Sequence, residues 1–148
     1  MAEVTVGSVM TDDVTTVGVN TPVTEIVRVL AESGFGAVPV IDDVGLVAGV
    51  VSEADLVARI EFGGPSASAP ASRAAERRLR KSRGLVAWEV MTRPVVTVDR
   101  DDPISLAARR LAEAGVRRLF VFGDDELVGV LTRGDLLRVL AGSRRGVV

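Results

Sequence analysis

The stretch GVVSEADL, from Gly49 to Leu56, returns as GVLTRGDL from Gly129 to Leu136. Outward from this stretch, most of the chain repeats in the same order: Val9-Met10-Thr11 and Val90-Met91-Thr92, Thr16-Val17 and Thr97-Val98, Pro22 and Pro103, Leu30-Ala31-Glu32 and Leu111-Ala112-Glu113, and Gly34 and Gly115. Two copies are too few for a solenoid. The repeat therefore predicts two small α/β units that bury their apolar faces against each other, with a cleft on a pseudo-twofold axis.

Each copy carries the same series of local patterns. Short runs rich in Val, Leu and Phe, bounded by Asp and Gly, predict strands at 14–19, 37–41 and 46–51, and at 95–100, 118–122 and 127–131. A helix follows each first strand, and a second helix covers about 53–60 in one copy and 133–140 in the other. The predicted order is β-α-β-β-α, twice.

The first helix of each copy has a start, a buried face and an end that can be predicted. Thr21 and Asp102 are good N-caps, and the proline after each is favoured at the first helical position. Gly34 and Gly115 stand where each helix would end. Spacing of i, i+3, i+4 and i+7 predicts the buried faces: Val23, Ile26, Val27 and Leu30, and Ile104, Ala107, Ala108 and Leu111.

Composition excludes several kinds of chemistry. The 148 residues contain no Cys and no His, which removes disulfides, thiolate metal sites and the usual general base. There is no phosphate-binding Gly-Lys-Ser/Thr loop and no complete dinucleotide fingerprint. We expect no enzyme activity, no metal and no catalytic cofactor. The N-terminus lacks the pattern of a signal peptide and no apolar run could span a bilayer, so we expect a cytoplasmic protein without a membrane partner.

The repeat divides the chain into residues 1–61, a linker at 62–86, residues 87–142, and a C-terminal tail at 143–148. The linker begins with a stretch rich in Gly, Pro, Ser and Ala, typical of a flexible loop, and continues with a basic stretch, Arg73 to Arg83, that could be helical. It is interpreted either as a solvated connector or as a docking surface for an acidic partner, a lipid or nucleic acid. No aromatic residue is interleaved to stack on bases, which argues against nucleic acid.

Ser52-x-x-Asp55 and Thr132-x-x-Asp135 each follow a buried strand and open a helix. A hydroxyl residue with an acid three positions on is a variant of the helix capping box. The functional alternative is an Asp that accepts hydrogen bonds from the two hydroxyls of a ribose, with Ser52 or Thr132 beside a phosphate at the helix N-terminus. The two interpretations are compatible.

Two further features are candidates for ligand contacts. Arg117-Arg118 precedes a strand, and paired arginines suit a phosphate as well as a salt bridge. The first copy has Gly36-Ala37 there, so the two copies are not equivalent. Thr16 and Thr97 lie in the first strand of each copy, either for β-propensity or for a contact to a ligand.

Taken together, these residues resemble a tandem pair of CBS (cystathionine β-synthase) motifs, also called a Bateman module. The resemblance rests on the Val-Met-Thr segments, the Thr-Val strands, Val38-Pro39-Val40-Ile41 and the two Gly-Val-x-Ser/Thr-x-x-Asp segments. It implies two β-α-β-β-α motifs packed through their sheets, two clefts for an adenosine-containing ligand such as AMP, ADP, ATP or S-adenosylmethionine, and pairing into a homodimer.

The resemblance also implies residue roles. Asp55 and Asp135 would hold a ribose, and Ser52 and Thr132 would lie near phosphate. Arg117 and Arg118 look like the basic pair that grips phosphate in γ subunits of AMP-activated protein kinase. By this resemblance, Arg117 and Arg118 would contact the phosphate of the nucleotide whose ribose lies on Asp55. The predicted function is a regulatory module that senses an adenine nucleotide and acts on an unknown protein partner; the alternative is a ligand-free dimerisation scaffold.

Overall fold

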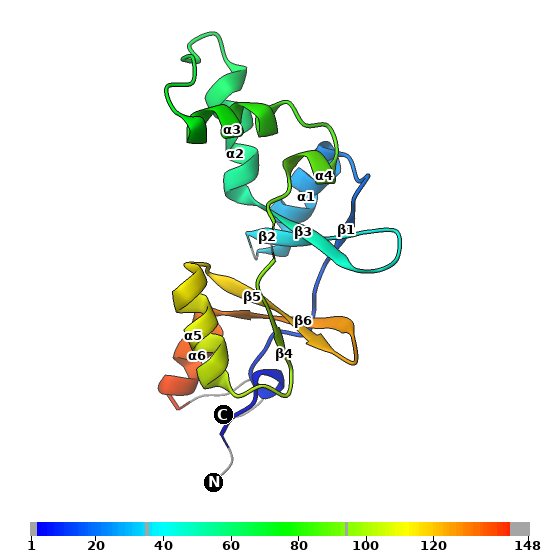
Figure 1. Ribbon diagram of the computed structural model, residues 1–148, viewed down its shortest axis with the longest axis vertical. Coiled ribbons are helices and arrows are strands. Elements are labelled where there is room, and N and C mark those ends of the chain that lie inside the picture. Colours follow the sequence, from blue (N-terminus) through cyan, green and yellow to red (C-terminus); the bar gives the residue numbers. More distant parts are fainter. Residues whose placement is uncertain (1–2, 35, 94, 143–148) are drawn as a thin grey trace. The chain divides into compact units, whose positions relative to one another are not determined.

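The computed structural model describes residues 3–34, 36–93 and 95–142, so the predicted tail at 143–148 lies outside the described residues. The chain forms two compact units. One unit is Thr15–Pro94, and the other combines the chain up to Val14 with the chain from Val95 onward. Each unit has its own three-stranded sheet (Figure 1). Each also has its own apolar core.

The unit Thr15–Pro94 is built on the first copy of the repeat. Its elements are β1 (Val17–Gly18), α1 (Val23–Ser33), β2 (Ala37–Ile41), β3 (Val47–Ser52), α2 (Glu53–Gly63), α3 (Arg73–Ser82) and α4 (Ala87–Val90). The central strand β2 pairs in parallel with β1 and antiparallel with β3. The basic stretch of the linker is helical, as α3, and it packs against α2 (Figure 1).

The other unit repeats this topology. Its elements are the 3₁₀ turn η1 (Val6–Ser8), β4 (Thr97–Asp99), α5 (Ile104–Ala114), β5 (Arg118–Gly123), β6 (Glu126–Thr132) and α6 (Arg133–Leu140). Strand β5 is central, parallel to β4 and antiparallel to β6. The α/β class and the β-α-β-β-α order are confirmed in both copies, although β1 and β4 are shorter than predicted, since the paired strand residues are Val17–Gly18 and Thr97–Asp99 alone.

The helix starts differ from the prediction. Each helix begins one residue later, with Pro22 and Pro103 at the N-cap position. The Thr21 hydroxyl instead accepts a hydrogen bond from Gly18 N (2.9 Å), and Asp102 accepts one from Asp99 N (3.0 Å). These side chains therefore close the turn that leaves the first strand. The predicted helix ends are confirmed, since Gly34 and Gly115 adopt the left-handed conformation there.

The buried faces of α1 and α5 are narrower than predicted. Val23, Ile26 and Leu30 are buried, but Val27 is 47% exposed. The matching Ala108 in α5 is also exposed. A helix that covers a sheet of only three strands buries a narrow stripe, so residues at the side of that stripe face outward.

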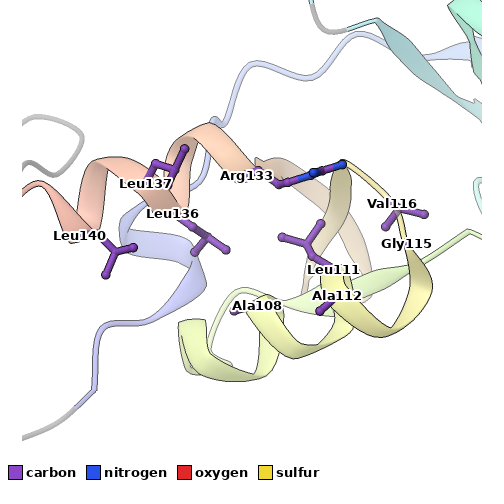
Figure 2. A pocket seen from close by; sticks show the side chains of 9 residues that line it. All are labelled: Ala108, Leu111, Ala112, Gly115, Val116, Arg133, Leu136, Leu137 and Leu140. Atoms are coloured by element: carbon purple, nitrogen blue, oxygen red, sulfur yellow. The ribbon is translucent and has the colours of Figure 1, made fainter.

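Apolar residues of α5 and α6, among them the exposed Ala108, Leu137 and Leu140, line a hollow of about 530 Å³ (Figure 2). Leu137 is 62% exposed and Leu140 is 85% exposed at its edge. The matching positions on the first copy, Val57 and Ile60, are 56% and 81% exposed. Both units thus present an apolar surface on equivalent helices.

The Val-Met-Thr segments explain why the packing units differ from the sequence repeats. Thr92, at the start of the second copy, pairs with Val50 of β3 through two backbone hydrogen bonds of 2.8 and 3.1 Å. Thr11, at the start of the first copy, pairs with Val130 of β6 through bonds of 2.8 and 2.9 Å. Each copy therefore contributes a segment to the sheet of the other copy. The domain boundaries drawn from the repeat stay a prediction, because the repeat and the packing divide the chain differently.

Two glycines make these pairings possible. A Cβ on Gly129 would lie 2.8 Å from the carbonyl oxygen of Thr11 and 2.5 Å from the sulfur of Met10. A Cβ on Gly49 would lie 3.0 Å from the carbonyl oxygen of Thr92 and 2.7 Å from the sulfur of Met91. The repeated Gly-Val therefore has a steric cause, since only glycine lets the paired segment approach so closely.

Candidate functional site

Asp55 and Asp135 occupy the same local position, the third residue of a helix that begins directly after a sheet strand. Ser52 N donates to Asp55 Oδ2 (2.8 Å), and Asp55 N donates to Ser52 Oγ (3.4 Å). In the second copy, Thr132 N donates to Asp135 Oδ2 (2.9 Å), and Asp135 N donates to Thr132 Oγ1 (3.1 Å). The predicted capping boxes are confirmed at both sites.

The two aspartates are more deeply buried than a helix cap requires. Asp55 is 9% exposed and Asp135 is 2% exposed, and in the described part of the chain they are the only buried residues with polar or charged side chains. A capping side chain works equally well at the surface, whereas a buried carboxylate requires partners for both of its oxygens. The cap occupies Oδ2 in each copy, so the environment of Oδ1 distinguishes the two sites.

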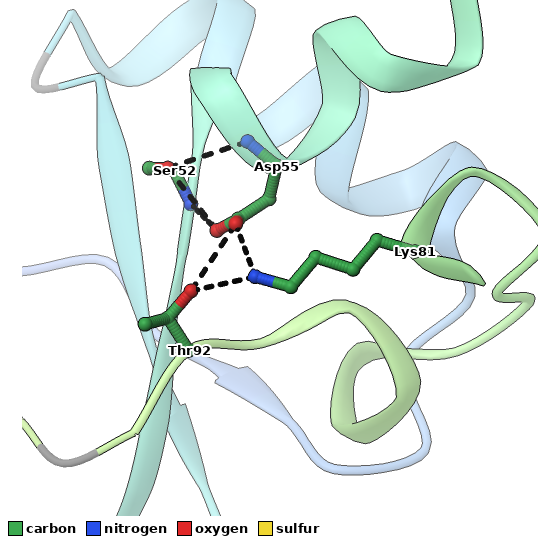
Figure 3. Close-up of polar contacts among 4 residues, drawn as sticks. All are labelled: Ser52, Asp55, Lys81 and Thr92. Carbon is green, nitrogen blue, oxygen red and sulfur yellow. Dashed lines mark hydrogen bonds and ion pairs between the residues drawn. The ribbon is translucent and has the colours of Figure 1, made fainter. Parts of the chain in front are cut away.

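The Oδ1 atom of Asp55 lies in a network of three side chains (Figure 3). Lys81 Nζ lies 2.7 Å from Asp55 Oδ1, and Thr92 Oγ1 donates to the same oxygen (3.1 Å). Lys81 Nζ also donates to Thr92 Oγ1 (2.8 Å). The three residues come from α2, from α3 in the linker and from the Val-Met-Thr segment that pairs with β3.

Sequence reasoning missed Lys81 and Thr92. The sequence places Lys81 in a basic stretch predicted to be a solvated connector or a docking surface, and Thr92 in a repeated segment without a predicted role. Two signals were available. Thr92 recurs as Thr11, and Lys81 is the only lysine among eighteen Lys and Arg residues. Neither signal identifies Asp55 as the partner, because the three residues meet only after the chain has folded.

Helix α3 is held beside α2 by two further contacts. Arg78 donates to both carboxylate oxygens of Glu61, at 2.8 and 2.9 Å. These hydrogen bonds lower the pKa of Glu61 and raise the pKa of Arg78. Arg59 donates to the carbonyl of Gly84, just after α3. The Glu61–Arg78 pair is exposed to solvent, so it aligns the two helices without stabilising them strongly.

The Asp135 site is built differently. Its Oδ1 pairs with Arg138, three residues further along the same helix, so no linker helix takes part in this pair. Arg118 lies directly across the β5–β6 ladder from Thr132, whereas in the first copy Ala37 lies across from Ser52. The difference between Arg117-Arg118 and Gly36-Ala37 thus places an arginine opposite Thr132 and an alanine opposite Ser52.

The remaining predicted site residues, Arg117, Thr97 and Thr16, are not among the contacts of Asp55 and Asp135 described above. Arg117 is exposed just before β5, and its carbonyl accepts a hydrogen bond from Arg133 N (3.3 Å). Thr97 opens β4 and its carbonyl accepts from Arg110 (2.7 Å). Thr16 is exposed before β1, at a hollow of about 510 Å³ whose lining differs from the surroundings of Asp55. The pairing of Asp55 with Arg117 and Arg118, which belong to different units, stays a prediction.

Within residues 3–34, 36–93 and 95–142, no group of three or more His, Cys, Asp or Glu side chains could hold a metal ion. No helix in these same ranges is long and apolar enough to cross a membrane. The cytoplasmic location stays a prediction.

Comparison with known proteins supports the resemblance found in the sequence. The profile of the CBS domain family matches residues 6–61 and 86–142. An uncharacterized protein of Methanopyrus kandleri is 28% identical over 94% of the chain, and the CBS domain-containing protein CBSX1, chloroplastic, of Arabidopsis thaliana is 30% identical over 95%. The chain spans 64% and 66% of the length of these two relatives.

A solved structure shares the fold. The crystal structure of CBSX2 from Arabidopsis thaliana in complex with AMP aligns with a TM-score of 0.76 at 33% identity. The alignment covers 95% of this chain and 99% of the CBSX2 chain. The similarity therefore extends over both copies of the repeat and the linker between them.

Proposed function

The chain belongs to the CBS domain family, with two CBS domains in tandem, and on this premise we propose that it is a non-enzymatic regulatory module that binds an adenosine-containing ligand. The observation that carries the proposal is the duplicated buried carboxylate, Asp55 and Asp135. The similarity to CBSX2, which was crystallised with AMP, supports an adenine nucleotide as the ligand.

In the proposed complex, the two ribose hydroxyls donate hydrogen bonds to an Asp carboxylate. Such bonds to an ionised acceptor are about twice as strong as neutral ones. The N-termini of α2 and α6, with Ser52 and Thr132 at their caps, favour a nearby anionic group. Arg117 and Arg118 supply a phosphate contact for which the first copy, with Gly36-Ala37, has no counterpart. Thr16 and Thr97 remain candidate contacts to the polar edge of the ligand.

The module would signal through a change in conformation. A ligand shifts a conformational equilibrium only by its difference in affinity for the two states. The partner that responds to this change is proposed to be another protein. A ligand-free dimerisation scaffold is the competing function.

A panel of nucleotides separates these two functions. Protein stripped of bound ligand is heated with adenosine, AMP, ADP, ATP, S-adenosylmethionine or GTP, and the midpoint of unfolding is recorded. A ligand at about 100 times its dissociation constant adds about 2.7 kcal/mol, which raises the midpoint by about 5–10 °C. A rise with one or more adenosine compounds and none with GTP supports the sensor. A panel without any shift supports the scaffold.

Replacing Arg118 with alanine should weaken AMP binding by about tenfold or more and leave adenosine binding unchanged. A guanidinium–phosphate contact is a charge-assisted hydrogen bond. Adenosine has no phosphate, so it does not make this contact and loses nothing when Arg118 is removed. Isothermal titration calorimetry measures both affinities, with Arg109→Ala, an exposed arginine on α5, as the matched control. Equal losses for AMP and adenosine would contradict a phosphate role for Arg118.

We also propose that the module forms a homodimer through its exposed helix surfaces. The apolar hollow between α5 and α6 (Figure 2) and the exposed Val57 and Ile60 on α2 are the supporting observations, since apolar patches of this kind mark protein interfaces. Sedimentation equilibrium of the purified protein gives the mass of the assembly and so decides between monomer and dimer.

A further inference from the structure

We infer that Lys81 occupies the place of the ligand on Asp55, so that an adenosine ligand must displace Lys81 and thereby remove one of the contacts that hold the linker helix α3. This inference rests on the proposed function, and it names a residue and an element that respond to the ligand. Its basis is the set of contacts around the Asp55 carboxylate (Figure 3).

The Asp55 carboxylate has no acceptor position left for a ribose. Its Oδ2 accepts from Ser52 N (2.8 Å) and Ser52 Oγ (3.1 Å). Its Oδ1 accepts from Lys81 Nζ (2.7 Å) and Thr92 Oγ1 (3.1 Å). An ionised carboxylate accepts about four hydrogen bonds through its two oxygens. A ribose that donates from two hydroxyls must therefore displace a bond that Asp55 already has.

Lys81 is the partner that can leave. Ser52 N belongs to the backbone at the start of α2, and Thr92 has a short side chain on a segment paired with β3. Lys81 carries its charge on a flexible four-carbon stem, and its side chain is 27% exposed, so its ammonium can move into water. Displacement of Lys81 opens one acceptor position on Oδ1, and rotation of the Ser52 hydroxyl opens a second on Oδ2 while Ser52 N keeps its bond there. Both ribose hydroxyls can then donate to Asp55 without disturbing the backbone of the helix cap or the sheet.

The release of Lys81 would loosen α3. Three polar contacts recorded among the described residues join α3 and the residues just after it to α2: Lys81 with Asp55, Arg78 with Glu61, and the Gly84 carbonyl with Arg59. Only the first lies at the candidate ligand site. The Asp135 site has no such connection, because its Oδ1 pairs with Arg138 of its own helix. Ligand binding at Asp55 alone is thus coupled to a basic helix in the linker.

The first test is the affinity of the Lys81→Met variant for AMP. Methionine keeps an unbranched side chain and removes the charge, while Asp55 keeps its bonds to Ser52 and Thr92. The apparent affinity of a site that is mostly occupied by an internal competitor is reduced by the fraction of time that the site is open. We expect Lys81→Met to bind AMP about tenfold more tightly than wild type. Arg80→Met, an exposed change on the same helix, should bind like wild type.

The second test uses the wild-type chain and does not depend on a variant. Lys81 is the only lysine, so protein grown with lysine carrying ¹³C at the ε-carbon gives a single side-chain NMR signal. Without ligand this signal should show a restrained side chain. Saturating AMP should shift it and give it the fast motion of an exposed lysine. A signal that stays restrained when AMP is bound would overturn the inference.

These outcomes distinguish the inference from the proposed function. If neither wild type nor Lys81→Met binds AMP or adenosine, the proposed function fails and this inference fails with it. If wild type binds AMP and Lys81→Met binds equally or more weakly, only the role of Lys81 is wrong. If Lys81→Met binds and wild type does not, both are supported and Lys81 is the stronger competitor.

Discussion

Replacing Asp55 with asparagine should weaken AMP binding by about a hundredfold while α2 keeps its cap. The single oxygen of the new amide must accept from Ser52 N, because that backbone donor is part of the capping box. The amide nitrogen then takes the position of Oδ1 and presents donors where the ribose hydroxyls also donate. Two charge-assisted hydrogen bonds are lost, which corresponds to about 3 kcal/mol.

The measurement compares AMP with 2′,3′-dideoxy-AMP by calorimetry. Wild type should prefer AMP, and Asp55→Asn should lose this preference because the hydroxyls no longer have an acceptor. Asp43→Asn makes the same chemical change at an exposed turn of the same unit and serves as the matched control. A variant that still prefers AMP over the dideoxy compound would show that Asp55 does not hold the ribose.

Replacing Gly129 with alanine should destabilise the chain by about 1–3 kcal/mol. The new methyl group would meet the Thr11 carbonyl at 2.8 Å and the Met10 sulfur at 2.5 Å. The flexible Met10 side chain can move aside. The carbonyl cannot, because the Thr11 backbone is hydrogen-bonded to Val130. The added methyl group therefore has to push the segment off β6 and weaken the pairing.

The same substitution at Gly134 supplies the control and should have the opposite sign. Gly134 lies in the first turn of α6, and the nearest atom to an added Cβ is the Thr132 hydroxyl at 3.5 Å, an ordinary contact. Alanine there should stabilise the chain by about 0.5 kcal/mol, because glycine loses more backbone entropy on folding. Urea denaturation followed by circular dichroism measures both variants. Equal effects of the two changes would contradict the steric explanation for Gly129.

Local patterns were sufficient to predict the elements of the fold. Runs rich in Val, Leu and Phe predicted the strands, and spacing of i, i+3, i+4 and i+7 predicted the first helix of each copy. The αL glycines at Gly34 and Gly115 end these helices as expected. The predicted starts of α1 and α5 were wrong by one residue, because Thr21 and Asp102 close a turn with the residue three positions earlier instead of capping the helix. A cap and such a turn use the same residue types, so the sequence alone does not separate them.

The candidate site could be predicted only as far as it is local. The bonds of Ser52 with Asp55 and of Thr132 with Asp135 span three residues and have a sequence signature. The bond from Lys81 to Asp55 spans 26 residues and the bond from Thr92 spans 37. Contacts over such separations depend on how α3 and the Val-Met-Thr segment pack, and no motif records that packing.

The Val-Met-Thr segment of each copy pairs with the sheet of the other copy, and this exchange bears on how such a chain could arise and how it could be divided. Each half of the gene encodes one repeat, but neither half encodes a complete sheet with its paired segment. A polypeptide with one repeat could form these pairings only by trading segments with a second molecule, as in domain swapping. Gene duplication and fusion of such a swapped pair would turn an association between molecules into one within a single chain, independent of protein concentration.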